Sequence, residues 1–307
     1  QLLCGVQRPD DPAIAIVDAL RAARPGAAID LVIDATVHGA SGKISNLVNM
    51  DRRCAHPIVI LSDSDIAVAP DYLARVLAAL DAPGVGAVTC PYRGRDDAGF
   101  SSLLGAAGLS YQFLPGAVLA AALGLARPCM GSTIALRRET LDRIGGFGRF
   151  VDVLADDYAI GEAIHALGLS VAVAPMLVTH ASAERSVAEL WRHELRWGAT
   201  LRDIIPAAYV SAVIAIPFPL ALLGALYWPV AGAVLAGLAF ASRAIIARAV
   251  DRVAGQRTAL VWLLPLRDCF SLGIFIATLF VRSVDWRGQR LRMTGDGRVT
   301  AVTELST

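Results

Sequence analysis

The stretch "VILSDSDIAVAPDYL" (residues 59–73) decides the fold, because an apolar run ends there in two carboxylates, Asp63 and Asp65. In an extended segment, side chains at i and i+2 point to the same side, so these carboxylates would lie next to each other. Like charges this close repel unless a cation or hydrogen bonds hold them. A divalent cation is one solution, since Mg²⁺ is commonly bound by one or two carboxylates together with substrate phosphates. The alternative is a solvated turn, in which Ser and Asp are common.

Around this stretch, apolar runs alternate with segments of helical spacing throughout residues 1–203. Strands are expected in "QLLCGVQ", "AIDLVID", "HPIVILSDSDI" and "VGAVTCPY", and helices in "DPAIAIVDALRAAR", "SGKISNLVNMDRRC" and "APDYLARVLAALD". This alternation predicts an α/β fold with a doubly wound, mostly parallel sheet. Ligands of such sheets bind beyond the carboxyl ends of the strands, where we expect Asp63, Asp65 and Asp11 to lie.

Three further segments of this region carry candidate site residues. The glycine loop "HGASGK" (38–43) precedes a helix whose free N–H groups can face a phosphate beside Lys43, although a plain turn explains the same glycines. The small-residue loop that opens "CMGSTIALRRETLDRIGGF" (129–147) contains Gly131 and Ser132. In "LADDYAIGEAIHALG" (154–168), Asp156 and Asp157 precede a helix, so the pair is either catalytic or supplies only an N-cap.

The segment "LWRHELRWGATLR" (190–202) predicts a helix that carries His193, Arg196 and Trp197. Taken alone, it is also typical of a basic amphipathic helix at a bilayer surface. His180, in "LVTH", is a candidate metal ligand. Because a lone histidine at a strand end is more often structural, we assign it no role.

The composition excludes several classes of protein. Of the 307 residues, 55% are hydrophobic and 18% are charged, and the net charge of +1 gives no reason to expect nucleic-acid binding. The five cysteines are scattered, odd in number and lack a C-x-x-C spacing. They indicate reduced thiols in a cytosolic compartment, without a disulfide framework or a zinc site.

The C-terminal third is apolar enough to enter a membrane. No charged residue occurs from Ile204 to Ser242, which is long enough for two crossings, and "LYWP" (226–229) is typical of a turn at a membrane interface. We therefore predict a transmembrane helical hairpin at 204–250, with a buried soluble helix pair as the alternative. A third apolar stretch, 259–281, is interrupted by Pro265, Arg267 and Asp268. It is either a kinked span with a functional ion pair or a re-entrant or interfacial segment.

Arginines set the expected orientation, because basic residues prefer the cytoplasmic side of a membrane. One cluster, 243–257, follows the hairpin, and a second, 282–292, follows the third apolar stretch. A hairpin returns the chain to its starting side, so residues 1–203 are expected in the cytoplasm. A single crossing by residues 259–281 would place the second cluster outside the cytoplasm. A re-entrant or interfacial segment within 251–307, followed by a basic tail, keeps both clusters in the cytoplasm and is therefore favoured.

Four motifs in order resemble the family 2 inverting glycosyltransferases, in particular their ceramide-glucosyltransferase branch. They are "VQRPDDPAI" with Asp11, "DSD" at 63–65, "ADDY" at 155–158 and "HELRW" at 193–197, and the tail "WRGQRLRM" (286–293) adds to the match. The resemblance covers nearly the whole chain. It implies a GT-A type, Rossmann-like fold followed by C-terminal transmembrane helices, and it favours the catalytic interpretation of the paired aspartates.

The resemblance also implies roles for the carboxylates. Asp11 and Asp63 would hold the uridine and ribose of a UDP-sugar donor. Asp65, with Asp63, would bind a divalent metal, Mg²⁺ or Mn²⁺, at the diphosphate. Asp157 would accept the proton of the acceptor hydroxyl as it attacks the anomeric carbon, with Asp156 beside it in the catalytic pair.

Other candidates take supporting roles under the same resemblance. Lys43 would lie near the donor nucleotide, and Gly131 and Ser132 would belong to the loop around donor and acceptor. His193 and Arg196 would contact the diphosphate. Trp197 would form an apolar wall beside the acceptor.

Within the branch, "GVQRPDDPAI", "HGASGKISNL" and "HELRW" are most similar to bacterial glycosyltransferases associated with hopanoid biosynthesis. This implies transfer of N-acetylglucosamine from UDP to a hopanoid polyol at the bacterial inner membrane, with the catalytic domain facing the cytoplasm. UDP-glucose and a ceramide-like lipid stay open as donor and acceptor. His193 stands where the branch usually has Gln or Arg. Members usually also have a membrane helix and a first strand before "QLLCGVQ", which we expect this chain to lack.

Two other interpretations compete with this one. A processive polysaccharide synthase shares the motifs but needs more membrane segments than the chain offers. A membrane-anchored pseudoenzyme that binds nucleotide or lipid without turnover is favoured by the expected lack of the first strand. The intact Asp65, Asp157, Arg196 and Trp197 oppose it.

Overall fold

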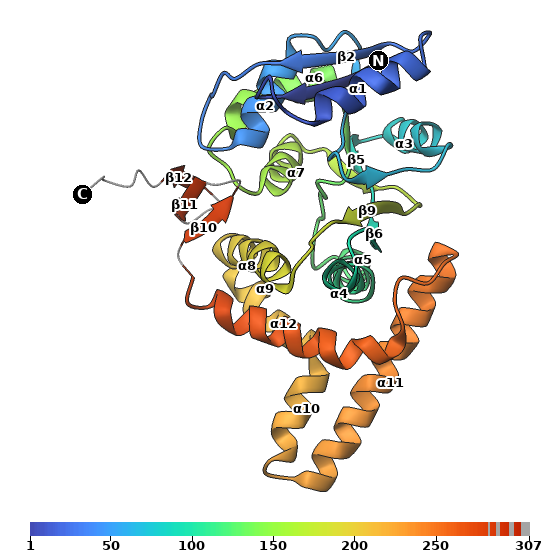
Figure 1. The fold of residues 1–307 in the computed structure, drawn as a ribbon, viewed down its shortest axis with the longest axis vertical. Coiled ribbons are helices and arrows are strands. Elements are labelled where there is room, and N and C mark those ends of the chain that lie inside the picture. The colour runs from blue at the N-terminus through green and yellow to red at the C-terminus, as the bar shows by residue number, and fades with distance from the viewer. Residues whose placement is uncertain (282, 287–288, 295–297, 302–307) are drawn as a thin grey trace, which may run out of the picture.

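The computed structural model describes residues 1–281, 283–286, 289–294 and 298–301 and stacks three parts along its long axis (Figure 1). Sheets with their covering helices form the first part, and the N-terminus lies there. A layer of helices follows, and a helical hairpin projects from the far end. The expected succession of an α/β region and apolar helices is therefore present.

The N-terminal unit contains β1 (Leu2–Val6), α1 (Ala13–Ala23), β2 (Ile29–Ile33) and α2 (Gly42–Asp51). β1 and β2 pair in parallel, as expected for strands joined by a crossover helix. The Asp11 carboxylate accepts a hydrogen bond from the Ala13 N–H (2.9 Å), so it closes the first turn of α1. Ser41 caps α2 by accepting from the Ile44 N–H (3.3 Å).

The central sheet has the order β3 (Ile58–Leu61), β7 (Ile134–Arg137), β5 (Val85–Thr89) and β8 (Ser170–Val173). β5 and β8 are parallel, but β7 runs antiparallel to both of its neighbours. The sheet is therefore mixed, where the sequence pattern indicates mostly parallel strands. The reason is that a helical excursion separates β5 from β7 and returns the chain from the opposite end.

A second sheet has the order β4 (Ile66–Ala67), β9 (Val178–Ser182) and β6 (Tyr92–Asp96). β6 and β9 are parallel, whereas β4 pairs with β9 antiparallel. In this register Ile66 lies opposite His180. The pairing thus brings His180 next to the end of the aspartate pair at 63–65.

Two apolar clusters cover the opposite faces of the central sheet, on α3 (Tyr72–Leu80) and α7 (Asp156–Ala166). Leu136 packs with Ile160 and Ile164 of α7, whereas its neighbour Ala135 packs with Val76 of α3. Adjacent residues of one strand face opposite sides, so both faces are buried. This explains the continuous apolar character of the strands in the sequence.

A long apolar helix lies outside the elements expected from the sequence. It consists of α4 (Phe100–Gly108), a π-helical turn η1 (Leu109–Phe113) and α5 (Leu114–Ala122). α4 packs directly against β6, and a Cβ at Gly94 would stand 2.4 Å from the Ala106 Cα. The helix therefore joins the second sheet to the helical layer.

The expected hairpin is present, with a bent first arm. It comprises α9 (Pro206–Ser211), the 3₁₀ turn η3 (Ala212–Ala215), α10 (Pro217–Ala225) and α11 (Pro229–Ala254). The segments 206–215 and 217–225 meet at an angle of 66°. α10 and α11 pack closely at the tip, where a Cβ at Gly232 would lie 2.4 Å from the Ala225 Cα. At about 1.5 Å per residue, α10 alone is about 14 Å long, whereas α11 exceeds the roughly 30 Å of a bilayer core.

Within the described residues, three helices are long and apolar enough to cross a membrane: 100–122, 229–254 and 261–278. A fourth span results if the bent pair 206–225 counts as one. The chain is therefore built for membrane association. The sequence alone indicated the hairpin and the third stretch but not residues 100–122.

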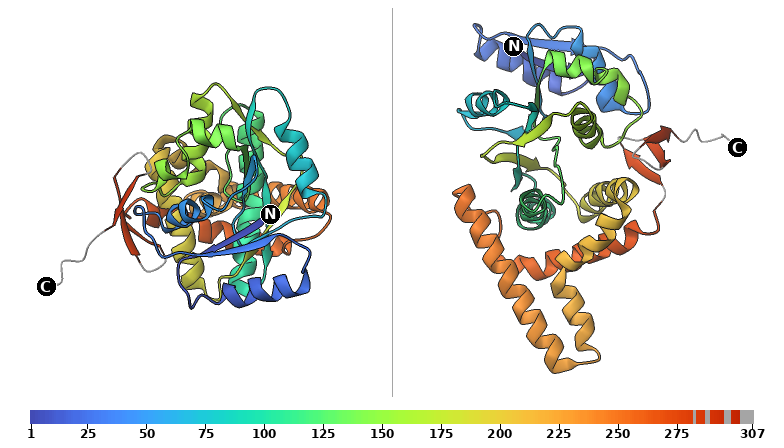
Figure 2. Two further views of the ribbon diagram at one scale, coloured as in Figure 1. Left: turned by 90° about the horizontal axis from the view of Figure 1, so that it is seen from above. Right: turned by 180° about the vertical axis from the view of Figure 1, so that it is seen from behind.

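The third apolar stretch forms α12 (Leu264–Thr278), which lies beneath α4 and α8 (Val187–Ile204) and across the direction of the hairpin (Figures 1 and 2). Arg267 and Asp268 pair with different partners. Arg267 makes a two-fold ion pair with Glu194 of α8 (2.6 and 2.7 Å), and Asp268 pairs with Arg243 of α11 (2.9 Å). The charges that interrupt the stretch thus tie α12 to both the α/β region and the hairpin.

The C-terminal segment forms the antiparallel strands β10 (Ser283–Trp286), β11 (Gln289–Met293) and β12 (Val299–Ala301) beside α8. The Val299 N–H donates to the Asp152 carbonyl (2.9 Å), which connects the tail to the α/β region. Positions 282 and 287 of the expected basic cluster, and 288 of the tail motif, lie outside the described residues. The part of the expected basic tail that the structure describes thus contains three short strands.

We expect the Arg267→Met variant to lose about 3–5 kcal/mol of unfolding free energy, because Glu194 then keeps a largely buried charge without its partner. The measurement is denaturant unfolding of the detergent-purified chain, followed by tryptophan fluorescence, since Trp191 of α8 packs edge to face against Phe270 of α12. The control is Arg75→Gln, which removes an exposed pair with Asp71 and should cost at most about 1 kcal/mol. Equal losses in both variants would contradict a structural role of the Arg267 pair.

Candidate active site

Lys43 holds two of the candidate carboxylates together. Its Nζ atom lies 3.1 Å from Asp63 Oδ1 and 3.0 Å from Asp156 Oδ2. Burial lowers the pKa of Lys43, but the carboxylates of Asp156, Asp63 and Asp157 outweigh burial and raise it above its usual value. Lys43 is therefore a permanent cation in an acidic cluster.

Three element ends position this cluster. Lys43 belongs to the first turn of α2, Asp63 follows β3, and Asp156 opens α7. Asp156 is buried, whereas Asp63 is partly exposed. The carboxyl end of a central strand thus meets two helix N-termini, where backbone N–H groups favour negative charge.

Asp157 lies beside this pair and is held by backbone donors. Its Oδ2 accepts from the Gly131 N–H (3.0 Å) and its Oδ1 from the Tyr158 N–H (2.8 Å). Burial and the charge of Asp156 raise the pKa of Asp157 to about 6, against the lowering effect of Lys43 and of the two N–H groups. A carboxylate with such a pKa is suited to accept a proton near neutral pH.

The interpretation of the acidic pair as a helix cap is wrong. Ala155 is the N-cap residue of α7 and makes no side-chain capping hydrogen bond, so neither aspartate occupies the N-cap position. Asp156 and Asp157 are its first two residues, and their side chains turn to Lys43 and Gly131 instead. Their position therefore needs an explanation other than capping.

Gly131 and Ser132 form the wall of the cluster. A Cβ at Gly131 would lie 3.3 Å from Asp157 Oδ2 and 3.5 Å from Asp63 Oδ2, so both carboxylates face this backbone. The buried Ser132 hydroxyl donates to the Cys90 carbonyl (2.8 Å). Gly131 thus borders the site, while the Ser132 side chain fixes the loop.

A second group of residues surrounds Asp65. Its Oδ2 lies 3.3 Å from His180 Nε2, and this contact keeps the pKa of Asp65 low despite burial. Burial lowers the pKa of His180, but Asp65 and, to a lesser extent, Glu184 raise it above its usual value. Half of the Asp65 side chain stays exposed, so the carboxylate is accessible from solvent.

Helix α8 contributes the aromatic side of this group. The Trp197 ring lies 4.4 Å from the His193 ring and 6.4 Å from the His180 ring, centroid to centroid. His193 Nδ1 forms a hydrogen bond with Glu184. Arg196 precedes Trp197 in the same turn and is half-buried. The "HELRW" motif and the aspartate pair therefore meet through His180.

Sequence reasoning assigned no role to His180 and overlooked Tyr92 and Glu184. Tyr92 is half-buried, and burial together with the charges of Asp157, Asp63 and Asp65 raises the pKa of its hydroxyl well above the usual range. Its ring lies 6.1 Å from that of His180. No local signal marks these residues, because the pairing of β9 with β4 and β6 brings them to the aspartates.

Asp11 is not brought to the acidic cluster by any contact in the described part of the chain. Its carboxylate closes the first turn of α1, at the carboxyl end of β1. Gln7 of the same loop donates to the Gly42 carbonyl (3.2 Å) at the start of α2. The expected role of Asp11 at the nucleotide thus stays a prediction.

The residues fit a divalent cation only with help from a ligand. Among the described residues, no group of three or more His, Cys, Asp or Glu side chains forms a complete metal site. Asp65 offers an accessible carboxylate, whereas Asp63 Oδ1 is engaged by Lys43. One or two carboxylates completed by phosphate oxygens is the arrangement that Mg²⁺ commonly has in proteins.

Comparisons with known proteins define the class. Among solved structures, the chain is similar to the mannosyltransferase PcManGT from Pyrobaculum calidifontis, determined in complex with GDP-Man and Mn²⁺. The TM-score is 0.51 at 19% sequence identity, over 91% of this chain and 78% of that one. The likeness confirms the GT-A-like fold, with a mixed sheet.

Sequence comparisons identify the family. The chain belongs to glycosyl transferase family 21, whose family model matches residues 1–299. It is 24% identical over 202 residues to ceramide glucosyltransferase 1 of Caenorhabditis elegans and 21% identical over 325 residues to ceramide glucosyltransferase 3. These matches cover 64% and 97% of this chain, and 42% and 67% of the two relatives. The chain is thus a member of a glycosyltransferase family, and its expected likeness to ceramide glucosyltransferases is confirmed.

The pKa of Asp157 predicts the pH dependence of transfer. Because a base works only when deprotonated, the rate should fall as the pH drops through about 6. In Lys43→Gln the cation that lowers this pKa is gone, so the acid limb of the pH–rate profile should move to higher pH. Lys43→Arg keeps the charge and serves as the control. An acid limb at the same pH in unmodified and Lys43→Gln protein would show that Asp157 does not set it.

Proposed function

We propose that the chain transfers a sugar, N-acetylglucosamine or glucose, from a UDP-sugar to a lipid hydroxyl at a membrane surface, with inversion at the anomeric carbon. The observation that carries the proposal is Asp157, a half-buried carboxylate with a raised pKa at the carboxyl end of the central sheet. It lies within a GT-A-like fold attached to apolar helices. A base in such a place can activate a lipid hydroxyl that arrives from the bilayer.

The surrounding residues divide the remaining tasks. Lys43 neutralises Asp63 and Asp156 and so admits the negative charge of a nucleotide diphosphate. The backbone at Gly131 fixes the direction of the Asp157 carboxylate. Trp197, between His180 and His193, offers an apolar surface beside the acceptor. Arg196 and His193 lie on the same helix, at the expected position of the diphosphate.

We also propose a divalent cation, Mg²⁺ or Mn²⁺, held by Asp65 with the donor diphosphate, and with Asp63 as the second carboxylate. The bound metal would stabilise the charge on the departing UDP. The exposed half of Asp65 supports this assignment, as does the Mn²⁺ bound to the structurally similar mannosyltransferase. His180 would orient Asp65 through its Nε2 atom.

Two acceptors follow from the similarities. A hopanoid polyol is our first candidate, because we interpret "HELRW" and the glycine loop "HGASGKISNL" as resembling the hopanoid-associated branch. A ceramide-like lipid is the second, since the two nematode relatives are ceramide glucosyltransferases. Both carry hydroxyl groups at the membrane surface, where the site would meet them.

We place the protein at the bacterial inner membrane, with residues 1–203 in the cytoplasm. The boundaries remain those expected from the sequence: a hairpin at 204–250 and an interfacial segment with a basic tail at 251–307. The arginines at the α11 end distant from the hairpin tip support this orientation. The position of α12, across the hairpin and against α8, supports an interfacial segment.

Asp157→Asn tests the proposed chemistry. We expect this variant to fold, to retain UDP binding and to lose 10²- to 10⁴-fold in transfer rate, because an amide cannot accept the proton. The measurement is the initial rate at saturating UDP-N-acetylglucosamine or UDP-glucose, with lipid products identified by mass spectrometry in extracts supplied with hopanoid or ceramide.

Asp156→Asn is the matched control for that variant, since it changes the adjacent carboxylate and should lose less activity. If Asp157→Asn keeps more than about a tenth of the rate, Asp157 is not the base. If the unmodified chain binds UDP but forms no glycolipid from either donor, the protein is a pseudoenzyme and the proposed transfer is wrong.

Metal dependence is tested by chelation. Transfer should stop after exhaustive treatment with EDTA and return on addition of Mg²⁺ or Mn²⁺. Asp65→Asn should raise the metal concentration needed for half-maximal rate, because one anionic ligand becomes neutral. Full activity after chelation would exclude the metal role of Asp65.

Topology is tested by cysteine labelling in cells, with the exposed Cys269 and the half-buried Cys4 and Cys54 replaced by serine, since the two other cysteines, Cys90 and Cys129, are buried. A cysteine in place of Trp228, at the hairpin tip, should react with a membrane-impermeant maleimide from outside the cytoplasm. A cysteine in place of Arg252 should react only after the membrane is opened. Labelling of the Arg252 position in intact cells would overturn the orientation.

A further inference from the structure

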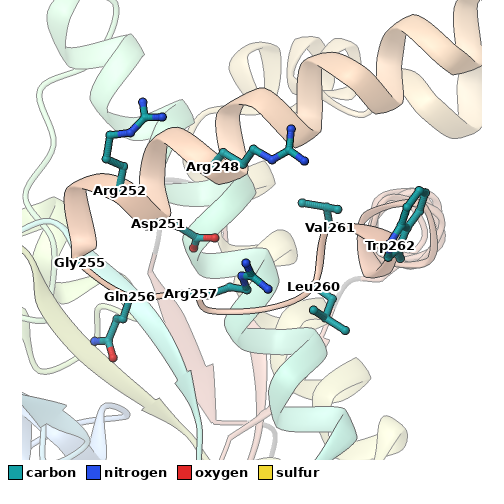
Figure 3. Close-up of a pocket in the computed structure, with 9 residues that line it drawn as sticks. All are labelled: Arg248, Asp251, Arg252, Gly255, Gln256, Arg257, Leu260, Val261 and Trp262. Atoms are coloured by element: carbon teal, nitrogen blue, oxygen red, sulfur yellow. The ribbon is translucent and has the colours of Figure 1, made fainter.

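A basic pocket lies where the hairpin returns to α12, and it shares no lining residue with the candidate active site. It is an open cavity of about 710 Å³ between the end of α11 and the start of α12 (Figure 3). Three arginines and an apolar group line it: Arg248, Arg252, Arg257, Leu260, Val261 and Trp262. This volume is typical of pockets for small molecules.

The three guanidinium groups are available to a ligand. Within the described part of the chain, none of them takes part in an ion pair or side-chain hydrogen bond. Figure 3 shows Arg248 and Arg257 extending into the space between the two helices, while Arg252 extends away from them. Unpaired guanidinium groups around one cavity favour an anion, and their planar fork suits phosphate oxygens.

The acidic residue of the pocket is already engaged. Asp251 Oδ1 accepts from the Tyr111 hydroxyl (2.7 Å) and from the Thr258 N–H (3.2 Å). The Tyr111 hydroxyl also accepts from the Ala259 N–H (2.9 Å), so η1 pins the loop that carries Arg257. With three arginines and one aspartate, the residues that line the pocket carry a formal charge of +2.

The apolar side of the pocket is exposed to the surroundings. Trp262 is 76% exposed and Leu260 is 60% exposed, although both are large apolar side chains. The Trp262 ring stacks on Phe240 of α11 at 5.4 Å, which keeps it at the mouth of the pocket. Tryptophan next to arginine is typical of the head-group level of a membrane.

We propose that this pocket binds the phosphate of an anionic phospholipid, with Arg248 and Arg257 contacting the phosphate and Leu260 and Trp262 contacting the glycerol and upper acyl chains. A net negative head group is favoured over a zwitterionic one, because the lining carries a charge of +2. The bound lipid fixes the corner between α11 and α12 at the anionic leaflet. The proposal does not depend on the sugar transfer described above.

The test is native mass spectrometry of the detergent-purified full chain with equal amounts of phosphatidylglycerol and phosphatidylcholine. We expect one phosphatidylglycerol to be retained in preference. Arg248→Gln/Arg257→Gln should weaken its retention about 25-fold, from about fivefold for each arginine near a membrane surface. Arg257→Lys keeps the charge but loses the planar fork of the guanidinium group, so it should weaken retention less than the double substitution does.

Arg24→Gln/Arg53→Gln is the charge-matched control, because it also removes two arginines, both exposed and in the N-terminal unit. Equal retention by the unmodified and doubly substituted chains would overturn the proposal, with matching circular dichroism as the check on folding. An equal effect of Arg24→Gln/Arg53→Gln would show diffuse attraction instead of a site and would overturn the proposal. Displacement of the lipid by millimolar inorganic phosphate would show a site for free phosphate, and would also overturn it.

Discussion

The ammonium group of Lys43 is the charge on which the arrangement of the site depends. Three carboxylates, Asp63, Asp156 and Asp157, converge on it from two separate segments, and without a cation their mutual repulsion would push the segments apart. The same charge opposes the effect of burial on the pKa of Asp157. Lys43 thus holds α2, β3 and α7 together at their junction and also lowers the pKa of Asp157.

A second set of charges connects this site to the membrane side. Arg243, Asp268, Arg267 and Glu194 form two buried ion pairs that run from α11 through α12 to α8. α8 also carries Trp197, which lies against the ring of His180 next to Asp65. The position of the hairpin is therefore coupled through packed side chains to the aromatic side of the site. A lipid held at the corner of α11 and α12 would act on the same chain of contacts.

Much of the fold could be predicted from the sequence, because many of its strands and helices depend on local patterns of apolar residues. The strands at 2–6, 29–33 and 58–61 and the helices α1, α2, α3 and α7 lie within the segments that apolar periodicity predicts, and α8 (187–204) extends beyond both ends of the helix predicted at 190–202. The half-buried helix 100–122 gave a poorer signal, since it is apolar on most sides and its packing on β6 comes from distant residues. The antiparallel course of β7 left no trace in the sequence, because strand direction depends on how the chain returns to the sheet.

The sequence by itself determined the α/β class, the hairpin and the carboxylates Asp63, Asp65, Asp156 and Asp157, because each belongs to a motif contained in a short segment. Tertiary structure alone decided their partners. Lys43 reaches Asp63 and Asp156 from another element, β4 pairs with β9 to bring His180 to Asp65, and Arg267 and Asp268 separate to different helices. The physical reason is that charge pairing acts over a few ångströms in space, and residues far apart in the sequence reach that distance only once the sheets and helices have packed.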